Sequence, residues 1–323
     1  MFKRSALSAL LCAGFAIAAA AQVKPEIAPG AFTASDGAEL PMRSWLPTGK
    51  PRAVIVALHG FADYSASYSR PAALWAKDGI ATFAYDQRGF GGAPHVLHWA
   101  GSPRMIADAD EAVAALRTQY PGVPIYLIGE SMGGAIALTA TTGPEPPNVS
   151  GVILVAPAIW EHSLLGSIER SALWVTRTAV PGLWLTAPPG LNIHPSNNIE
   201  MLRAMSRDSL VQMGARADTT AGLMDLMDEA GGQVSRIRLP TLILYGAHEE
   251  VLPHSAVTGF LARVPAKDVR VALYPKGYHM LLRDLNGDIV AKDVAAWIAD
   301  RSAPLPSGAE CRGDAASAAP CRH

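Results

Sequence analysis

Three residue types that could carry out acyl transfer occur in this sequence in a suggestive order. Ser131 is the centre of Gly129-Glu-Ser-Met-Gly133, a Gly-x-Ser-x-Gly pattern between an apolar run and a stretch of small residues. A serine on a sharp strand-to-helix turn presents its hydroxyl as a nucleophile. We therefore predict that Ser131 attacks a carbonyl carbon. The alternative is an ordinary turn with a solvated serine.

A serine nucleophile needs a base and an acid that orients the base. Of nine histidines, His279 fits best, because it follows the last strand-like run and precedes the last helical stretch. In hydrolases of this type the chain order is serine, acid, histidine. The acid should therefore lie in the loop at residues 246–253, where Glu249 and Glu250 adjoin.

The oxygen that becomes negative during attack needs preorganised donors. We expect these to be the backbone N–H of Met132, directly after the nucleophile, and that of Phe61, in the loop after an apolar run. Gly60 would let the backbone approach closely. His59 is expected to make structural hydrogen bonds. Near this loop, residues 86–91 lack phosphate-loop spacing, and we expect Asp86 and Arg88 to bridge locally.

Composition and charge exclude several other functions. Lys and Arg number 27 against 28 Asp and Glu, so no basic face for nucleic acid is expected. Three cysteines are too few for a disulfide scaffold or a four-cysteine zinc site. His95 and His98 lack the glutamate of a His-Glu-x-x-His site. We expect neither a metal nor an organic cofactor. The oligomeric state is left open.

The elements needed to position these residues alternate along the chain. Residues 32–46 predict two short strands around the tight-turn pair Asp36-Gly37. Apolar runs at residues 53–58, 80–85, 125–128, 152–155, 241–245 and 269–274 predict further strands, and helical patterns lie between them. This alternation predicts an α/β fold with a mostly parallel sheet covered by helices on both faces. The core is expected at residues 30–156 and 237–300. Residues 157–236, which show no strand-like run, predict a helical cap carrying Trp160, Trp174 and Trp184 over the strand ends.

Both chain ends lie outside this core. Lys3 and Arg4, the apolar residues 5–18 and Ala19-Ala20-Ala21 are typical of a cleavable signal peptide at residues 1–21. We expect a periplasmic or secreted protein that begins at Gln22; an intact Met1 end would instead favour an uncleaved anchor. Residues 302–323 predict a flexible tail, in which Cys311 and Cys321 could form a disulfide.

With these motifs, the chain resembles the monoacylglycerol lipase and lysophospholipase group of the α/β-hydrolase superfamily, whose domain is also labelled serine aminopeptidase-like. The resemblance rests on His59-Gly60, residues 85–91, residues 129–134, Ala156-Pro157 and residues 279–284. It implies an α/β-hydrolase fold with Ser131 as nucleophile, His279 as base and Phe61 and Met132 as oxyanion donors. The acid position three residues after Gly246 holds Glu249, where the family usually has aspartate, so Glu249 is preferred over Glu250.

The function expected from this resemblance is hydrolysis of monoacylglycerol-like or lysophospholipid esters through an acyl-enzyme. The apolar cap would suit an acyl chain and would allow transient contact with a membrane surface. Alternatives of the same fold are an aminopeptidase, which needs an acidic site for a free amine, and a small-ester carboxylesterase. A ligand-binding protein on a hydrolase scaffold is a third class, but the intact set of Ser131, His279 and Glu249 argues against it.

Overall fold

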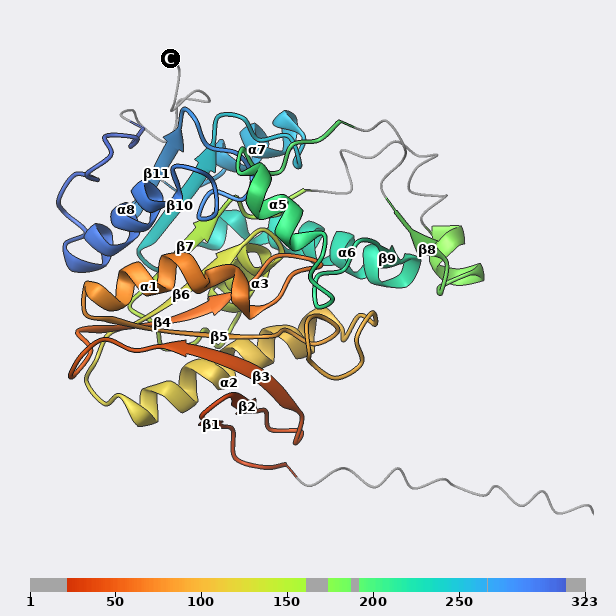
Figure 1. The fold of residues 1–323 in the computed structure, drawn as a ribbon, viewed down its shortest axis with the longest axis horizontal. Coiled ribbons are helices and arrows are strands. Elements are labelled where there is room, and N and C mark those ends of the chain that lie inside the picture. The colour runs from red at the N-terminus through yellow and green to blue at the C-terminus, as the bar shows by residue number, and fades with distance from the viewer. Residues whose placement is uncertain (1–21, 161–173, 187–191, 266, 312–323) are drawn as a thin grey trace, which may run out of the picture.

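A single nine-stranded sheet forms the centre of the computed structural model, which describes residues 22–160, 174–186, 192–265 and 267–311. Its strand order is β1-β2-β3-β5-β4-β6-β7-β10-β11 (Figure 1). The strands are β1 Glu26–Ala28, β2 Ala31–Thr33, β3 Glu39–Trp45, β4 Ala53–Leu58, β5 Ile80–Tyr85, β6 Ile125–Glu130, β7 Gly151–Val155, β10 Thr241–Gly246 and β11 Val269–Tyr274. From β5 to β11 all neighbours pair in parallel, whereas β1, β2 and β3 pair antiparallel. The predicted mostly parallel α/β fold is confirmed.

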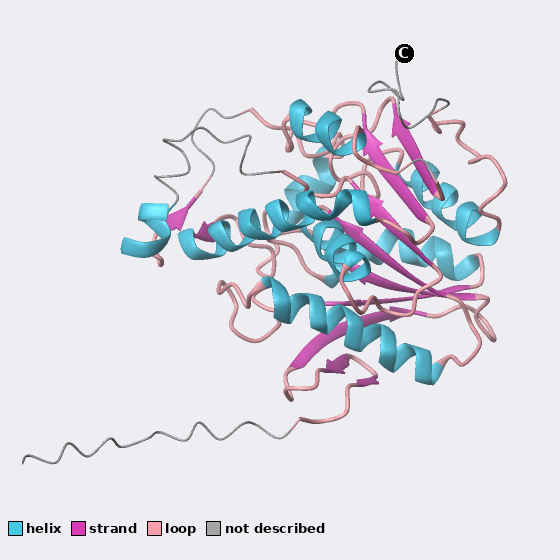
Figure 2. Ribbon diagram, turned by 180° about the vertical axis from the view of Figure 1, so that it is seen from behind, coloured by secondary structure: helices cyan, strands magenta, loops and turns pink. Residues whose placement is uncertain are grey.

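Helices cover both faces of this sheet (Figure 2). They are α1 Ser69–Lys77, α2 Ser102–Gln119, α3 Met132–Thr142, α5 Ile199–Met205, α6 Ala217–Gln233, α7 His254–Leu261 and α8 Gly287–Ala299, with 3₁₀ turns at Ser65–Tyr68 and Val234–Arg236. Side chains of a strand alternate between faces. On β4, Val54, Val56 and Leu58 therefore pack in the core under α2 and α3, whereas Ile55 packs with Trp75 in the core under α1 and α8.

The predicted cap contains strands as well as helices. Between residues 157 and 236, α5 and a helical segment at 174–179 accompany a two-stranded antiparallel ladder of β8 Trp184–Leu185 and β9 Ala215–Arg216. The helical cap predicted from sequence thus also carries this short ladder, which could not be predicted because strands of two residues leave no apolar periodicity. Helix α6, placed in the cap by sequence, packs against α3 and buries Leu226 and Met227 in the sheet-covering core.

Part of the predicted flexible tail lies against the edge strand of the sheet. Cys311 N–H donates to the Val271 carbonyl, and Leu273 N–H donates to the Ala309 carbonyl. Leu305 is buried, and an ion pair joins Arg270 to Glu310. Residues 302–311 thus cover an edge that would otherwise expose unpaired backbone groups, which corrects the predicted start of the tail.

The remaining predictions about the chain ends concern residues that the structure does not describe. The predicted signal peptide at residues 1–21 lies outside the described residues, and so does Cys321. Cys311 is disulfide-bonded, with a partner outside the described ranges. Within the described ranges, no helix is both long and apolar enough to cross a membrane.

One half-buried carboxyl group on α2, that of Asp110, predicts a pH-dependent stability. Burial, together with the charge of Glu111, raises the pKa of Asp110 from 3.8 to about 7. Its Oδ1 atom is buried and has no hydrogen-bond partner among the described residues. Between the unfolded and folded pKa values the folded state binds more protons, so stability should fall as pH rises from about 4 to 7.

Asp110→Asn, which stays uncharged, should remove this decline. We expect the variant to be more stable than the wild type by about 1–3 kcal/mol at pH 8, with the difference vanishing near pH 4. Urea unfolding across this pH range measures the effect, with the exposed Asp78→Asn as control. Parallel stability curves for wild type and Asp110→Asn would contradict the assignment.

Candidate active site

Ser131 occupies a strained turn between β6 and α3. Its backbone has φ 52° and ψ −115°, outside the regions usual for non-glycine residues. The glycines of the pattern allow this turn. A Cβ atom on Gly133 would lie 2.1 Å from the Leu58 carbonyl oxygen, and one on Gly129 would lie 2.1 Å from the Gly133 carbonyl oxygen. The nucleophile-elbow geometry predicted for this segment is therefore present.

The predicted base and acid are in direct contact. His279 Nδ1 lies 2.8 Å from Glu249 Oε2, and both side chains are buried, with exposed fractions of 6% and 7%. Glu249 Oε1 accepts hydrogen bonds from the backbone N–H groups of Val251 and Leu252, at 2.8 and 3.0 Å. Because an ionised carboxylate only accepts, Nδ1 carries the proton and Nε2 is left to accept one.

The adjacent glutamate points elsewhere. Glu250 Oε2 accepts from the His194 backbone N–H at 2.8 Å and lies 3.1 Å from His194 Nδ1. These contacts lower the pKa of the Glu250 carboxyl group. Glu250 is more than a third exposed, as expected for a surface charge, although its pairing with the cap segment was not predicted. The sequence preference for Glu249 over Glu250 agrees with this geometry.

The fold brings the three loops to the same edge of the sheet. Ser131 follows β6, Glu249 follows β10 and His279 follows β11, at the carboxyl ends of parallel strands. The acid and histidine loops touch at their glycines, since a Cβ on Gly246 would lie 2.3 Å from the Gly277 carbonyl carbon.

The loop after β4 lies against the serine. A Cβ atom on Gly60 would be 3.4 Å from the Ser131 Cβ atom, so only a small residue leaves this approach open. Phe61 comes next in this loop and packs edge-on against Phe90, with ring centroids 5.2 Å apart. Met132 is the first residue of α3, where backbone N–H groups have no intrahelical partner. Met132 thus adjoins the serine in the chain, and Phe61 follows the glycine that lies against it.

His59 holds this loop in place, as predicted. The Gln87 backbone N–H donates to His59 Nε2 at 2.8 Å, so Nδ1 carries the proton and donates to the Gly60 carbonyl at 2.8 Å. Burial lowers the pKa of His59, which favours this neutral form. With both ring nitrogens occupied, His59 positions Gly60 and has no free nitrogen for proton transfer.

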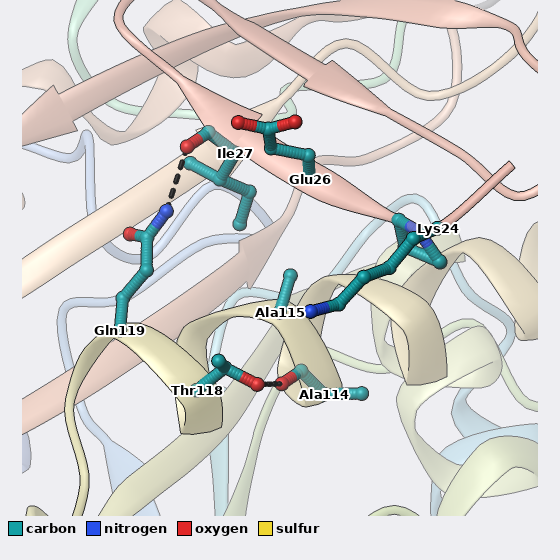
Figure 3. A pocket seen from close by; sticks show the side chains of 8 residues that line it. Lys24, Glu26, Ile27, Ala114, Ala115, Thr118 and Gln119 are labelled. Carbon is teal, nitrogen blue, oxygen red and sulfur yellow. Dashed lines mark hydrogen bonds between the residues drawn. The ribbon is translucent and has the colours of Figure 1, made fainter.

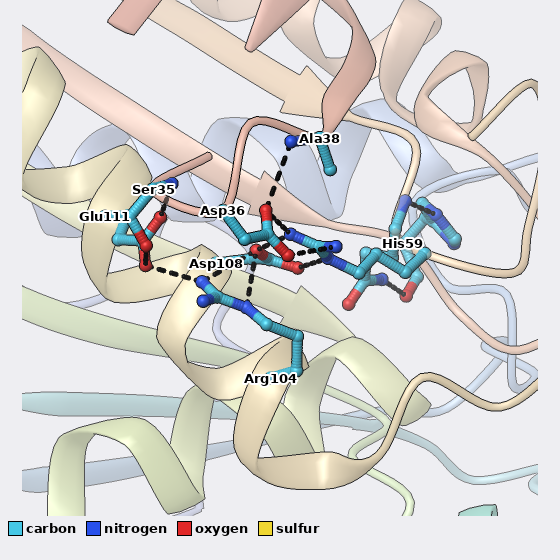
Figure 4. Close-up of polar contacts among 9 residues, drawn as sticks. Ser35, Asp36, Ala38, His59, Arg104, Asp108 and Glu111 are labelled. Atoms are coloured by element: carbon cyan, nitrogen blue, oxygen red, sulfur yellow. Dashed lines mark hydrogen bonds and ion pairs between the residues drawn. The ribbon is translucent and has the colours of Figure 1, made fainter. Parts of the chain in front are cut away.

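The predicted bridge between Asp86 and Arg88 does not form. Asp86 instead accepts from the backbone N–H groups of Ser65 and Gly92, at 2.9 and 2.8 Å. Arg88 pairs with Asp108 at 2.6 Å and with Asp36 at 2.8 Å, in a cluster that continues to Arg104 and Glu111 (Figure 4). The pairing was predicted from nearness in sequence, but the carboxylates that pair with Arg88 come from α2 and from the turn before β3.

No metal cluster occurs among the described residues, and a pocket found away from the serine offers no second set of reactive groups. Across those residues, no group of three or more His, Cys, Asp or Glu side chains could hold a metal ion. The pocket lies between the N-terminal segment and the end of α2, lined by Lys24, Pro25, Glu26, Ile27, Ala114, Ala115, Thr118 and Gln119 (Figure 3). The C-terminal end of α2 leads into β6, so this pocket is at the opposite sheet edge from Ser131.

One group near the site was missed by the sequence reasoning. Arg283, four residues after His279, forms buried ion pairs with Asp63 and Glu130. The sequence does show a charged residue close to each of three predicted site residues: Asp63 follows Phe61, Glu130 precedes Ser131 and Arg283 follows His279. Nothing in the sequence shows that these three charges meet, because 220 positions separate the first from the last.

The family follows from a comparison with known proteins. Residues 49–286 match the family model described as serine aminopeptidase, S33. The chain belongs to this family. It is 26% identical to a monoacylglycerol lipase from Mycolicibacterium smegmatis, over 83% of this chain and 95% of that protein, and 24% identical to human monoglyceride lipase, over 83% and 89%. The structure of a monoacylglycerol lipase from Paleococcus ferrophilus superposes with a TM-score of 0.68 at 23% identity, covering 80% of this chain and 98% of that one.

These comparisons agree with the fold that the sequence predicted. The S33 match covers the elbow, the acid loop and His279. The superposition with the Paleococcus ferrophilus enzyme covers most of this chain, which confirms the α/β-hydrolase fold. Family, fold and relatives together support a serine ester hydrolase.

Proposed function

We propose that this protein hydrolyses monoacylglycerol-like esters through a triad of Ser131, His279 and Glu249. The observation that carries the proposal is the buried contact between His279 and Glu249 at the sheet edge where Ser131 occupies its strained turn. The relatives named as monoacylglycerol lipases cover most of this chain and support the substrate class.

The proposed reaction has two halves. Ser131 Oγ attacks the ester carbonyl while His279 Nε2 takes its proton, and the backbone N–H groups of Phe61 and Met132 donate to the oxyanion. The bond to the alcohol then breaks, and His279 returns the proton to the departing glycerol oxygen. Water, deprotonated by the same nitrogen, next attacks the acyl-enzyme, which releases the fatty acid and restores Ser131. Glu249 stabilises the imidazolium in both halves.

Exposed apolar side chains of the cap support a lipid substrate. Trp174, Val175, Val180, Leu183 and Trp184 each expose between 46% and 60% of their surface. Such apolar groups gathered in one short region mark a surface that meets another apolar phase. We propose that this part of the cap contacts lipid while substrate is taken up. Trp160, by contrast, packs against the core and serves the fold.

The acidic groups of the cap give an aminopeptidase less support. Asp208 accepts from Tyr64 Oη at 2.7 Å, Asp218 pairs with Arg216 at 2.7 Å, and Asp225 pairs with Arg177 at 2.9 Å. A carboxylate already paired with an arginine is a poor acceptor for a substrate amine. The other acidic residues of the predicted cap are Glu200, Asp228 and Glu229, together with Glu161 and Glu169, which lie outside the described residues.

A rate series distinguishes these functions. We expect kcat/KM for p-nitrophenyl esters to rise from acetate to decanoate by about 10-fold or more, since each buried methylene contributes about 0.8 kcal/mol. Monoacylglycerol and lysophospholipid run beside them test the head group. Activity confined to acetate would indicate a small-ester carboxylesterase, and release of nitroaniline from an aminoacyl anilide would indicate a peptidase.

The cap's part in this preference can be tested in the same assay. Trp184→Ser should flatten the chain-length dependence while leaving acetate turnover within about 2-fold of the wild type. The matched control is Leu46→Ser. Leu46 is exposed and directly follows β3, at the side of the sheet where the parallel strands begin and away from their carboxyl ends. An unchanged chain-length dependence in Trp184→Ser would contradict a role of this surface in lipid uptake.

A further inference from the structure

Three buried charges connect the loops that carry the proposed catalytic groups. Arg283 Nη2 lies 2.7 Å from Asp63 Oδ2 and 3.4 Å from Glu130 Oε2. Their side chains have exposed fractions of 10%, 5% and 3%. We refer to Asp63, Glu130 and Arg283 as the buried ion cluster. Charges removed from water to this degree persist only when paired.

Each member of the cluster belongs to a different loop of the site. Asp63 is two residues after the proposed donor Phe61, and its N–H donates to the Gly60 carbonyl at 3.4 Å. Glu130 is the last residue of β6, directly before Ser131. Arg283 lies one turn after His279 and donates its N–H to the Met280 carbonyl at 2.9 Å. One guanidinium group therefore links the oxyanion loop, the nucleophile turn and the histidine loop.

These links have a mechanical consequence. Ser131 is held in a backbone conformation that costs energy, and the loop of His279 has no strand pairing of its own. Ion pairs in a dry environment are stiff, because any separation of the charges is opposed by a strong, weakly screened attraction. Loss of one member would leave its partners buried and unpaired, and the loops would shift to reach water.

The cluster also carries an unbalanced charge. Two carboxylates face one guanidinium, and Glu130 Oε1 is buried with no hydrogen-bond partner in the described part of the chain. Burial raises the pKa of Glu130, against the lowering effect of Arg283, and the nearby charge of Asp63 raises it further.

We propose that Asp63, Glu130 and Arg283 are positioning residues that hold the nucleophile, the base and the oxyanion donors in register. They touch neither substrate nor reacting atoms. The inference rests on the proposed function, since it assumes that Ser131 and His279 act together. It predicts that removing a charge from the cluster lowers the turnover rate and leaves substrate binding nearly unchanged.

The test uses the full chain with charge-removing variants of similar shape. Arg283→Met and Glu130→Gln should each lower kcat on p-nitrophenyl butyrate about 10–100-fold, the range expected when reacting groups are misplaced by about 1 Å. KM should change by less than about 3-fold. Arg283→Lys, which keeps the cation, should recover most of the loss. If Arg283→Met does not fold, Glu130→Gln and Asp63→Asn decide the outcome.

A matched control separates positioning from loss of stability. Asp293 is a fully buried carboxylate on α8 that accepts from Tyr274 Oη at 2.7 Å and also from Ser307, two partners outside the loops of Ser131, Glu249 and His279. Asp293→Asn should lower the melting temperature and leave kcat within about 2-fold of the wild type. An equal loss of kcat in Asp293→Asn, or full kcat in both Glu130→Gln and Asp63→Asn, would overturn the proposal.

The rate of labelling by an alkyl fluorophosphonate gives a readout that needs no ester turnover. If the wild type is labelled at Ser131 and hydrolyses no ester, only the proposed substrate fails, and slower labelling of Glu130→Gln still supports the cluster. If the wild type is active and Glu130→Gln is labelled at the wild-type rate, only the cluster fails. A wild type that is neither labelled nor active would overturn the proposed function and the cluster with it.

Discussion

Replacing Ser131 by alanine is expected to reduce ester hydrolysis by about 10⁵–10⁶-fold, to the limit of detection. Without the hydroxyl no acyl-enzyme can form, and loss of a nucleophile costs about as much as loss of a whole triad. His279, Glu249 and the oxyanion donors would remain in place, so only the small catalysis that they supply without a nucleophile should persist. Initial rates on p-nitrophenyl butyrate measure the loss.

Two further measurements show that the fold survives this change. Ser131→Ala keeps the Cβ atom and the strained turn, so its urea midpoint should match that of the wild type. Ser131→Gly should be more stable than Ser131→Ala, because glycine adopts a positive φ without strain. Wild-type turnover in folded Ser131→Ala would show that another residue is the nucleophile.

Glu249→Gln is expected to lower kcat about 10³–10⁴-fold with little effect on KM. Glu249 accepts a hydrogen bond from His279 Nδ1–H at 2.8 Å, and its other oxygen accepts from two backbone N–H groups. The neutral amide can turn its NH₂ group toward the ring, which would favour the wrong tautomer, and it does not stabilise an imidazolium. Steady-state kinetics of the purified variant measure the effect.

Glu250→Gln provides the matched control for this prediction, because it removes the same charge one residue away. Its carboxylate pairs with His194 at the surface, where solvent screens the interaction, so this pair contributes little to the active site. We expect its kcat to stay within about 3-fold of the wild-type value. The reverse ranking of the two variants would move the acid to Glu250 and contradict the orientation seen here.

Much of the site could be predicted because local chemistry constrains it. Gly129 and Gly133 are required where any Cβ would collide with backbone, and such a turn needs a buried strand before it and a helix after it. Glu249 was preferred over Glu250 as the acid because of its position in the loop, and in the structure its carboxylate contacts His279. Continuous apolar runs, whose six residues are all buried in β4 and in β10, correctly predicted a parallel sheet covered on both faces.

Features that depend on contacts between distant segments could not be predicted. Arg88 pairs with Asp108 and Asp36 and not with Asp86, which is nearer in sequence, because only the folded chain brings α2 beside this loop. Arg283 reaches Asp63 for the same reason. The Ala-, Gly- and Ser-rich composition of the tail indicated flexibility, yet residues 302–311 gain backbone hydrogen bonds from an open sheet edge that no local pattern reveals.

The measurement that tests the central claim most directly is the site of covalent labelling by an alkyl fluorophosphonate. Peptide mapping by mass spectrometry should find one adduct, on Ser131 Oγ, and ester turnover should disappear in proportion to the labelled fraction. His279→Ala should be labelled far more slowly, because the hydroxyl then has no base. An adduct on a different residue, or full turnover in completely labelled protein, would contradict the proposal that Ser131 is the nucleophile.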